Sequence, residues 1–288
     1  DELHTAFNFD YLKCPWDAAT LRATIEGSLH ATGLVGAPTT WVLENHDVPR
    51  VRTKYGMEAA GARLPSSNVA APPQVEPDDA RGQARARAAM LLLLGLPGSA
   101  YIYQGQELGL EEVLALPASA RQDPAFLRTG GAEGFRDGCR VPMPWTSTGP
   151  SLGFSPSGES WLPIPEHWAT TSVEAQTDDP ESMLELTRRV LRLRRAEPAL
   201  GGGDLQWISE EGEDCLVLRR TAAPDDPLVA AEPAPHVLIA MNLGETSTFV
   251  AAAELLAASS PGVVPGQAPA GADSAGYWLP PDTAAWLR

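Results

Sequence analysis

The sequence has few cysteines and no long hydrophobic run, and each shortage excludes a class of protein. Its three cysteines, Cys14, Cys139 and Cys215, are widely separated and odd in number, so they indicate neither a disulfide framework nor a paired metal-binding motif. The longest apolar stretch, Ala88 to Leu96, is far shorter than the roughly 20 residues that cross a bilayer. We therefore expect a cytoplasmic protein with no membrane segment, no metal and no cofactor.

Basic side chains are also scarce. The chain carries 21 Lys and Arg against 37 Asp and Glu, a formal charge of −16, and no basic cluster could follow a phosphate backbone. This balance argues against nucleic acid and anionic membranes as partners. Apolar residues are plentiful, at 43% of 288, which is enough to bury the core of one large domain or two ordinary ones.

The first part of the chain alternates between strand and helix patterns. Predicted strands cover Ala6–Tyr11, Thr39–Glu44 and Ser99–Tyr103, and predicted helices cover Asp17–Ala31, Asp79–Leu94 and Asp178–Glu197. The last helix has clear end signals, with Asp179 as N-cap, Pro180 in the first position and Pro198 as the stop. Three such units are typical of part of an α/β barrel, over residues 1–198.

The pattern changes near residue 199 to short β runs separated by Pro, Gly and Asp. Predicted strands cover Leu205–Ile208, Cys215–Thr221, Val237–Leu243 and Thr248–Val250, with a last one near Trp286. The tract from Ala257 to Gly276, rich in Ala, Gly, Pro and Ser, is predicted to be a mobile loop. Residues 199–288 are therefore expected to form an antiparallel, all-β domain.

His46 and Asp47 are the sharpest candidates for chemistry. They follow a predicted strand, and barrel enzymes place their reacting groups at the C-terminal ends of such strands. The string Asn-His-Asp is weak by itself, because a turn capped by Asn45 and Asp47 with a surface histidine would read the same way. Spacing alone leaves both interpretations open.

Further strings follow in a fixed order along nearly the whole chain. They are Asn45-His46-Asp47 continued by Pro49 and Arg50, then Tyr101–Gly109, then an Arg-Asp-x-x-Arg-x-Pro-x-x-Trp segment from Arg136 to Trp145, and last Leu279–Thr283. Together these strings resemble the α-glucosidase branch of the α-amylase superfamily of glycoside hydrolases. The resemblance implies the C-terminal part of a (β/α)8 TIM barrel, about three βα units, followed by the β domain.

The resemblance also implies roles for single residues. Asp47 would stabilise the transition state, as neither nucleophile nor acid, while His46 and Arg140 would bind the glucose being cleaved. Arg50 is expected at the rim of the pocket. The substrate would be an α-glucoside oligosaccharide that loses its terminal glucose with retention of configuration. Arg136 and Asp137 stay open between a surface ion pair and a part of the site.

The two reacting carboxyl groups of a retaining glycosidase, about 5 Å apart, have no matching motif here. Gly134-Phe135-Arg136-Asp137 resembles the nucleophile motif Gly-Phe-Arg-x-Asp, but the spacer before the Asp is missing. The acid would lie on a strand before Ala6, and the sequence opens on Asp1 with no initiator methionine. We expect an inactive C-terminal half whose partner is the missing N-terminal half. Alternatives are a trehalose-forming mutase relative and a non-catalytic sugar-binding remnant.

Overall fold

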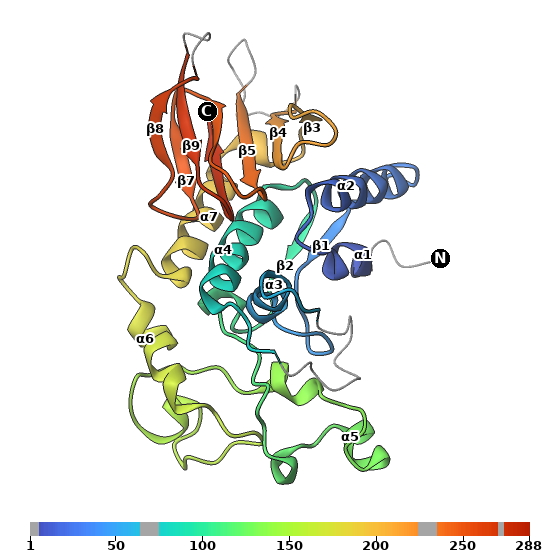
Figure 1. Cartoon of the computed structure of the whole chain (residues 1–288), viewed down its shortest axis with the longest axis vertical. Helices are drawn as coiled ribbons and strands as arrows, with labels where there is room; N and C mark the ends of the chain where they lie inside the picture. Colours follow the sequence, from blue (N-terminus) through green and yellow to red (C-terminus); the bar gives the residue numbers. More distant parts are fainter. Residues whose placement is uncertain (1–5, 64–74, 224–234, 270–273) are drawn as a thin grey trace. The chain divides into compact units, whose positions relative to one another are not determined.

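The computed structural model describes residues 6–63, 75–223, 235–269 and 274–288 (Figure 1). The chain forms two compact units, each made of separate segments. The first unit contains Asp1–Leu43, Arg87–Tyr101 and Arg188–Arg288, and the second contains Glu44–Ala86 and Ile102–Thr187. This division differs from the boundary expected near residue 199, which stays a prediction.

The first unit contains a pair of parallel strands of the kind that builds an α/β barrel. Strand β1 (Thr40–Val42) pairs in parallel with β2 (Ser99–Tyr101), with Thr40 opposite Ser99 and Val42 opposite Tyr101. Both strands, and the helices α2 (Ala18–Gly33) and α4 (Asp79–Gly95), lie where the sequence predicts them. Parallel neighbours separated by a helix are the building unit of α/β folds.

The predicted strand Ala6–Tyr11 is wrong, because this segment leads into a helix. Helix α1 (Phe9–Lys13) begins after Asn8, whose side-chain oxygen accepts a hydrogen bond from the Tyr11 amide at 3.0 Å. The aromatic alternation suggested a strand, but an asparagine in the N-cap position stabilises the first helical turn instead. Within the described residues, β1 and β2 are thus the two strands of the parallel sheet.

Two antiparallel sheets follow in the first unit, and they confirm the predicted all-β region. One sheet has the order β3-β4-β5-β10-β7 and the other β6-β9-β8. Their strands are β3 (Asp204–Trp207), β4 (Cys215–Thr221), β5 (His236–Asn242), β6 (Thr248–Ala251), β7 (Leu255–Ala258), β8 (Val264–Gln267), β9 (Ala275–Leu279) and β10 (Thr283–Leu287). Figure 1 shows β8 and β9, which pair in the second sheet, next to each other in red.

The tract 257–276 was expected to be a mobile loop, and this expectation is corrected. Strand β8 and the ends of β7 and β9 lie within it, while residues 270–273 are outside the described part of the chain. Its Ala and Gly residues suggested a loop on composition alone. Between closely paired strands, however, small residues fit: a Cβ on Gly276 would lie 2.2 Å from the Val250 carbonyl oxygen.

Arg220 on β4 is the largest buried cation of the first unit's β region, and it is bonded entirely to backbone oxygens. Its side chain donates to the carbonyls of Gly95 and Gly201 at 2.8 Å, of Asp204 at 3.3 Å and of Gly203 at 3.4 Å. The side chain has no exposed surface. It therefore satisfies several carbonyl groups that would otherwise be buried without a donor.

Helix α7 (Met183–Ala196) starts later than predicted. Ser182 caps it, since the Ser182 hydroxyl accepts from the Glu185 amide at 3.1 Å. Asp178 has a φ of 64°, so the chain turns sharply before the helix, and Asp179 with Pro180 belongs to that turn. The apolar spacing was read correctly, but two cap signals stand close together in the sequence.

Several short helices complete the second unit. They are α3 (Val51–Ala59), α5 (Pro124–Thr129) and α6 (Val173–Gln176), with 3₁₀ turns at Gln106–Leu108, Ala118–Ala120, Arg136–Arg140, Pro150–Gly153 and Glu166–Thr171; a further 3₁₀ turn, Pro198–Leu200, lies in the first unit. An apolar cluster around Trp168 and Val141, both fully buried, holds these loops. No helix in the described ranges is long and apolar enough to cross a membrane.

All three cysteines are buried free thiols. Burial raises the pKa of the Cys215 thiol to about 12, and it also raises the pKa of Cys139. A thiol with a raised pKa holds little thiolate at neutral pH and reacts slowly. These side chains therefore behave as small apolar core residues.

Candidate active site

The loop after β1 presents His46 and Asp47 at the surface of the second unit. The Asn45 side chain accepts a hydrogen bond from the Asp47 amide at 2.8 Å, so the asparagine-capped turn of the simpler interpretation is present. His46 Nε2 lies 3.4 Å from Asp47 Oδ2, and the two side chains are 61% and 45% exposed. The turn therefore holds an imidazole and a carboxylate together, open to a ligand.

Two guanidinium groups meet on one oxygen of Asp47. Arg140 Nη2 donates to Asp47 Oδ1 at 2.9 Å, and Arg136 Nη1 donates to the same oxygen at 3.2 Å. Arg140 Nε also donates to the His46 carbonyl at 2.8 Å. The structure thus brings together three of the residues predicted from the sequence, and it adds Arg136 to them.

Two buried carboxylates lie behind Arg136, and one of them, Asp123, was missed by the sequence analysis. Asp123 pairs with both ends of the Arg136 fork, at 2.7 Å from Nε and 2.8 Å from Nη2. Asp137, left open between surface and site, is buried and accepts from the backbone amides of Gln122 and Asp123. The sequence signal for Asp123 was Pro124 directly after it, which marks a helix N-cap.

Arg50 was expected at the rim of the pocket, but the structure places it in the interior with no exposed surface. Its side chain donates to the carbonyls of Gln104 at 2.9 Å and Cys139 at 3.1 Å, and lies 3.4 Å from Glu44 Oε1. The position just before helix α3 turns this side chain inward. Arg50 therefore stabilises the loops that contain Gln104 and Cys139, and its buried side chain does not face a ligand.

Glu44 closes this buried network. Its second oxygen accepts from the Val51 amide at 2.6 Å, and the side chain is fully buried. Burial raises the pKa of the Glu44 carboxyl to about 7, and the charge of Arg50 offsets only part of that rise. Near neutral pH the folded chain therefore holds a carboxyl group that titrates directly behind the Asn45-His46-Asp47 turn.

The raised pKa of Glu44 predicts that stability falls as the pH rises. A carboxyl whose pKa is higher in the folded state stabilises that state most below about pH 4.5, and this contribution is lost as the pH rises through about 7. The loss amounts to about 3 kcal/mol. Urea unfolding at about pH 5 and about pH 8 measures it. The neutral variant Glu44→Gln should lose less stability over this interval, and equal losses in both proteins would contradict the assignment.

Glu107 lies in the 3₁₀ turn Gln106–Leu108 that follows β2, and burial also raises the pKa of its carboxyl. One of its oxygens is buried and has no hydrogen-bond partner in the described structure. It does not join the cluster of Asp47, Arg136 and Arg140 through any contact found between described residues.

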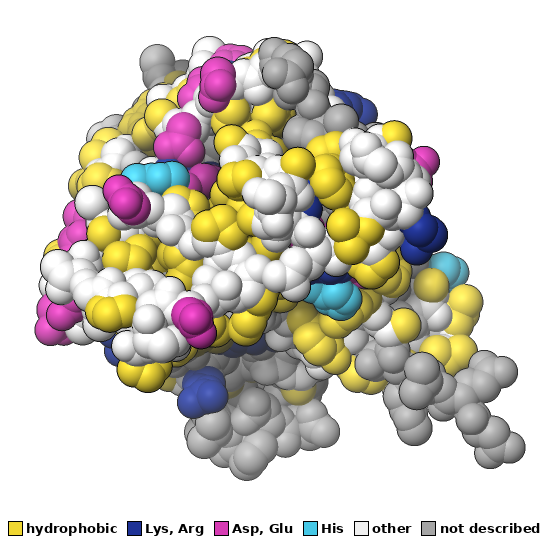
Figure 2. Space-filling model, turned by 90° about the horizontal axis from the view of Figure 1, so that it is seen from below, with side chains coloured by type: hydrophobic (Ala, Val, Ile, Leu, Met, Phe, Trp, Pro, Cys, Tyr) yellow, Lys and Arg dark blue, Asp and Glu magenta, His cyan; other side chains and the backbone are white. Residues whose placement is uncertain are grey.

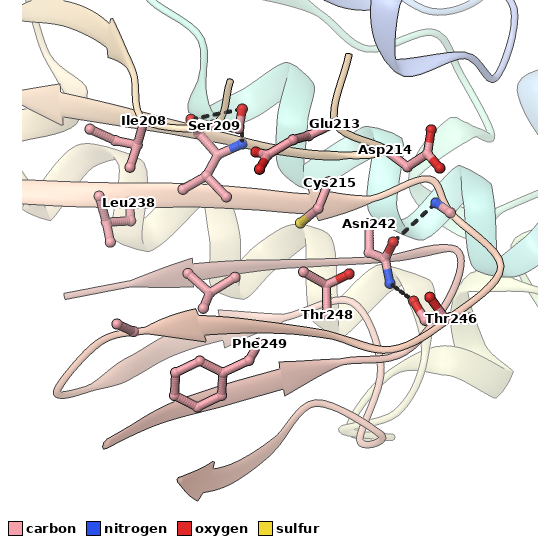
Figure 3. A pocket seen from close by; sticks show the side chains of 14 residues that line it. Ile208, Ser209, Glu213, Asp214, Cys215, Leu238, Asn242, Thr246, Thr248 and Phe249 are labelled. Carbon is pink, nitrogen blue, oxygen red and sulfur yellow. Dashed lines mark hydrogen bonds between the residues drawn. The ribbon is translucent and has the colours of Figure 1, made fainter. Parts of the chain in front are cut away.

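A separate cleft lies in the β region of the first unit. Its volume is about 490 Å³, and it is lined by residues of β4, β5 and β6, among them Cys215, Leu238 and Phe249. Figure 3 shows these side chains around the cleft. The one fully buried amide there, Asn242, is already satisfied by the carbonyls of Thr246 and Leu279 and by the Gly244 amide. The cleft is lined by apolar and polar side chains in similar measure, and its buried amide is already satisfied within the protein.

The distribution of charged side chains can be followed on one face of the described part of the chain (Figure 2). On the face in Figure 2, the described Lys and Arg side chains lie scattered among uncharged ones, without an extended basic surface. Among the residues that the structure describes, no group of three His, Cys, Asp or Glu side chains is placed to hold a metal ion. The expected absence of a cofactor stays a prediction.

Known proteins match the chain in both sequence and structure. The family model described as "Alpha amylase, catalytic domain" matches residues 4–203. "Probable alpha-glucosidase" from Rhizobium meliloti is 32% identical over 212 residues, covering 74% of this chain and 34% of that protein. "Trehalose synthase/amylase TreS" from Mycobacterium tuberculosis is 34% identical over 141 residues, covering 47% of this chain and 20% of that protein. The matched part of this chain thus spans about a third of the first of these curated relatives.

A solved structure aligns over the entire chain. The α-glucosyl transfer enzyme XgtA is 29% identical with a TM-score of 0.67, covering 100% of this chain and 47% of that one. Isomaltulose synthase from Klebsiella, at 21% identity and a TM-score of 0.69, covers 99% of this chain and 51% of that one, and shows the fold alone. The predicted fold class, part of a TIM barrel followed by an all-β domain, is confirmed.

Proposed function

Because the chain belongs to the α-amylase superfamily of glycoside hydrolases, in its glucosidase branch, we propose that it is the C-terminal half of a retaining α-glucosidase. The whole enzyme removes terminal α-linked glucose from short oligosaccharides. The observation that carries this proposal is the carboxylate of Asp47, exposed on a strand-end turn and held by Arg140 beside His46. Free thiols support a location in the cytoplasm.

Each group has a role that its chemistry permits. The Oδ2 oxygen of Asp47, to which neither arginine donates, accepts hydrogen bonds from glucose hydroxyls. His46 binds a neighbouring hydroxyl. These bonds strengthen as the sugar ring flattens toward the oxocarbenium-like transition state. Arg140 holds the Asp47 side chain in position. The nucleophile and the acid are supplied by the N-terminal half, which is the partner of this chain.

The proposal predicts that the chain alone does not hydrolyse a nitrophenyl α-glucoside. With neither reacting carboxyl group present, the substrate can be positioned but not cleaved. Release of nitrophenol by purified chain should not exceed that of buffer, and saturable release would contradict the half-enzyme assignment. The DNA upstream of the Asp1 codon gives an independent test, since an in-frame Gly-Phe-Arg-x-Asp sequence is expected there.

A second candidate, a transglycosylating or isomerising enzyme, is favoured by the identity with the trehalose synthase TreS. Such enzymes use the same glucose-binding groups and differ in what accepts the glucosyl unit. Incubating maltose with the protein of the complete reading frame separates the two. Glucose alone supports the hydrolase, and trehalose or another disaccharide supports the isomerising enzyme.

A further inference from the structure

A buried carboxylate is linked to Asp47 through one guanidinium group. We propose that Asp123 is a positioning residue for Asp47 and acts through Arg136. The inference rests on the proposed function, because it assumes that Asp47 binds the sugar. Asp123 itself is fully buried and touches no ligand.

Asp123 is held in place by two hydrogen bonds that do not involve Arg136. The Asp123 amide donates to Asp137 Oδ2 at 3.0 Å, and Asp123 Oδ1 caps helix α5 by accepting from the Ala125 amide at 2.9 Å. Asp137 is itself 2% exposed. The paired Arg136 holds the pKa of Asp123 at about 2, so this carboxylate stays charged at neutral pH. A fixed charge in the interior thus anchors the more exposed arginine.

The geometry of the fork decides where Arg136 can point. Its Nε and Nη2 atoms are both occupied by Asp123, at 2.7 and 2.8 Å. A planar guanidinium held at two corners cannot rotate freely. Its remaining nitrogen, Nη1, is therefore directed at Asp47 Oδ1, 3.2 Å away.

Arg136 and Arg140 together leave the Oδ2 oxygen of Asp47 for the sugar. Arg136 and Arg140 both donate to Oδ1, whereas Oδ2 faces His46 Nε2 at 3.4 Å. An aspartate that is 45% exposed would otherwise rotate between several positions. With Oδ1 held, Oδ2 and the imidazole present a fixed pair of groups to adjacent hydroxyls.

A purely structural ion pair is the alternative, and the same unit offers a matched control. Arg52 and Asp79 form a two-point pair of the same geometry, at 2.8 and 2.6 Å, in which the aspartate is 59% exposed and makes no contact with Asp47 among the described residues. Replacing either aspartate by asparagine removes one such pair. Asparagine at position 123 can still cap helix α5. A purely structural role predicts that the two variants bind sugar alike.

Maltose binding to the purified chain, followed by NMR titration, is the test. Asp123→Asn should weaken binding about three- to tenfold, and Asp79→Asn less than about twofold. Arg136→Met should weaken binding as much as Asp123→Asn, and the double variant Asp123→Asn/Arg136→Met should be no weaker than either. Unchanged affinity in Asp123→Asn, or additive losses in the double variant, would overturn the proposal.

The outcome also separates this inference from the proposed function. If the unaltered chain binds no maltose, the sugar-binding assignment fails. The positioning role is then decided by the carboxyl ¹³C resonance of Asp47, which should shift in Asp123→Asn and stay in place in Asp79→Asn. A resonance that does not move in Asp123→Asn overturns the positioning role.

Discussion

Replacing Arg220 by alanine is expected to destabilise the chain by about 3–5 kcal/mol, because the variant leaves several buried carbonyl groups without a donor. The lost bonds join β4 to the end of α4 and to the glycine-rich segment that starts at Gly201. Urea unfolding followed by circular dichroism measures the change. The stability of Arg220→Lys should lie between that of the unaltered chain and that of Arg220→Ala. The ammonium group of lysine keeps the charge but cannot reach as many carbonyls.

Arg219→Ala is the matched control for Arg220→Ala. It removes the neighbouring arginine of the same strand, whose side chain points to the opposite face of the sheet and is partly exposed. Its cost should be below about 1 kcal/mol. If both variants lost the same stability, the backbone bonds of Arg220 would not be the cause.

The second large effect is expected for Arg50→Met in the second unit. The substitution removes the donor to the Gln104 and Cys139 carbonyls and leaves Glu44 buried without its cation. We expect a loss of about 3–5 kcal/mol at pH values above the pKa of Glu44. Unfolding by urea at about pH 8 would detect it.

The double variant Arg50→Met/Glu44→Gln isolates the charge from the packing. With a neutral side chain at position 44, no uncompensated carboxylate remains, and about half of the loss should be recovered. A double variant as unstable as Arg50→Met would show that the lost carbonyl bonds, and not the charge, dominate.

The sequence predicted the elements whose local signals agree with their packing. Strand β4 has the predicted bounds, and helix α2 begins beside its predicted N-terminus because Asp17 caps it. Local signals failed where two of them competed. Asn8 capped a helix within an aromatic run that resembles a strand, and Ser182 capped α7 in place of Asp179.

Only part of the candidate site could likewise be predicted from the sequence. His46, Asp47 and Arg140 stand in motifs, so the sequence could place them together. Asp123 lies in no motif, and its pairing with Arg136 depends on how two loops fold onto each other. Arg50 follows Asp47 closely in the sequence yet turns to the interior, because helix α3 begins directly after it. Side-chain direction on irregular loops is decided by tertiary contacts that spacing does not contain.

The buried thiols can be used to measure local opening of the chain, because none has to be introduced. Cys14 and Cys215 belong to the first unit and Cys139 to the second, so alkylating reagents can modify each only when its surroundings open. Labelling rates resolved by mass spectrometry would therefore give a separate opening free energy for each unit. If a partner chain were to stabilise one unit more than the other, the protection of its cysteine would rise first.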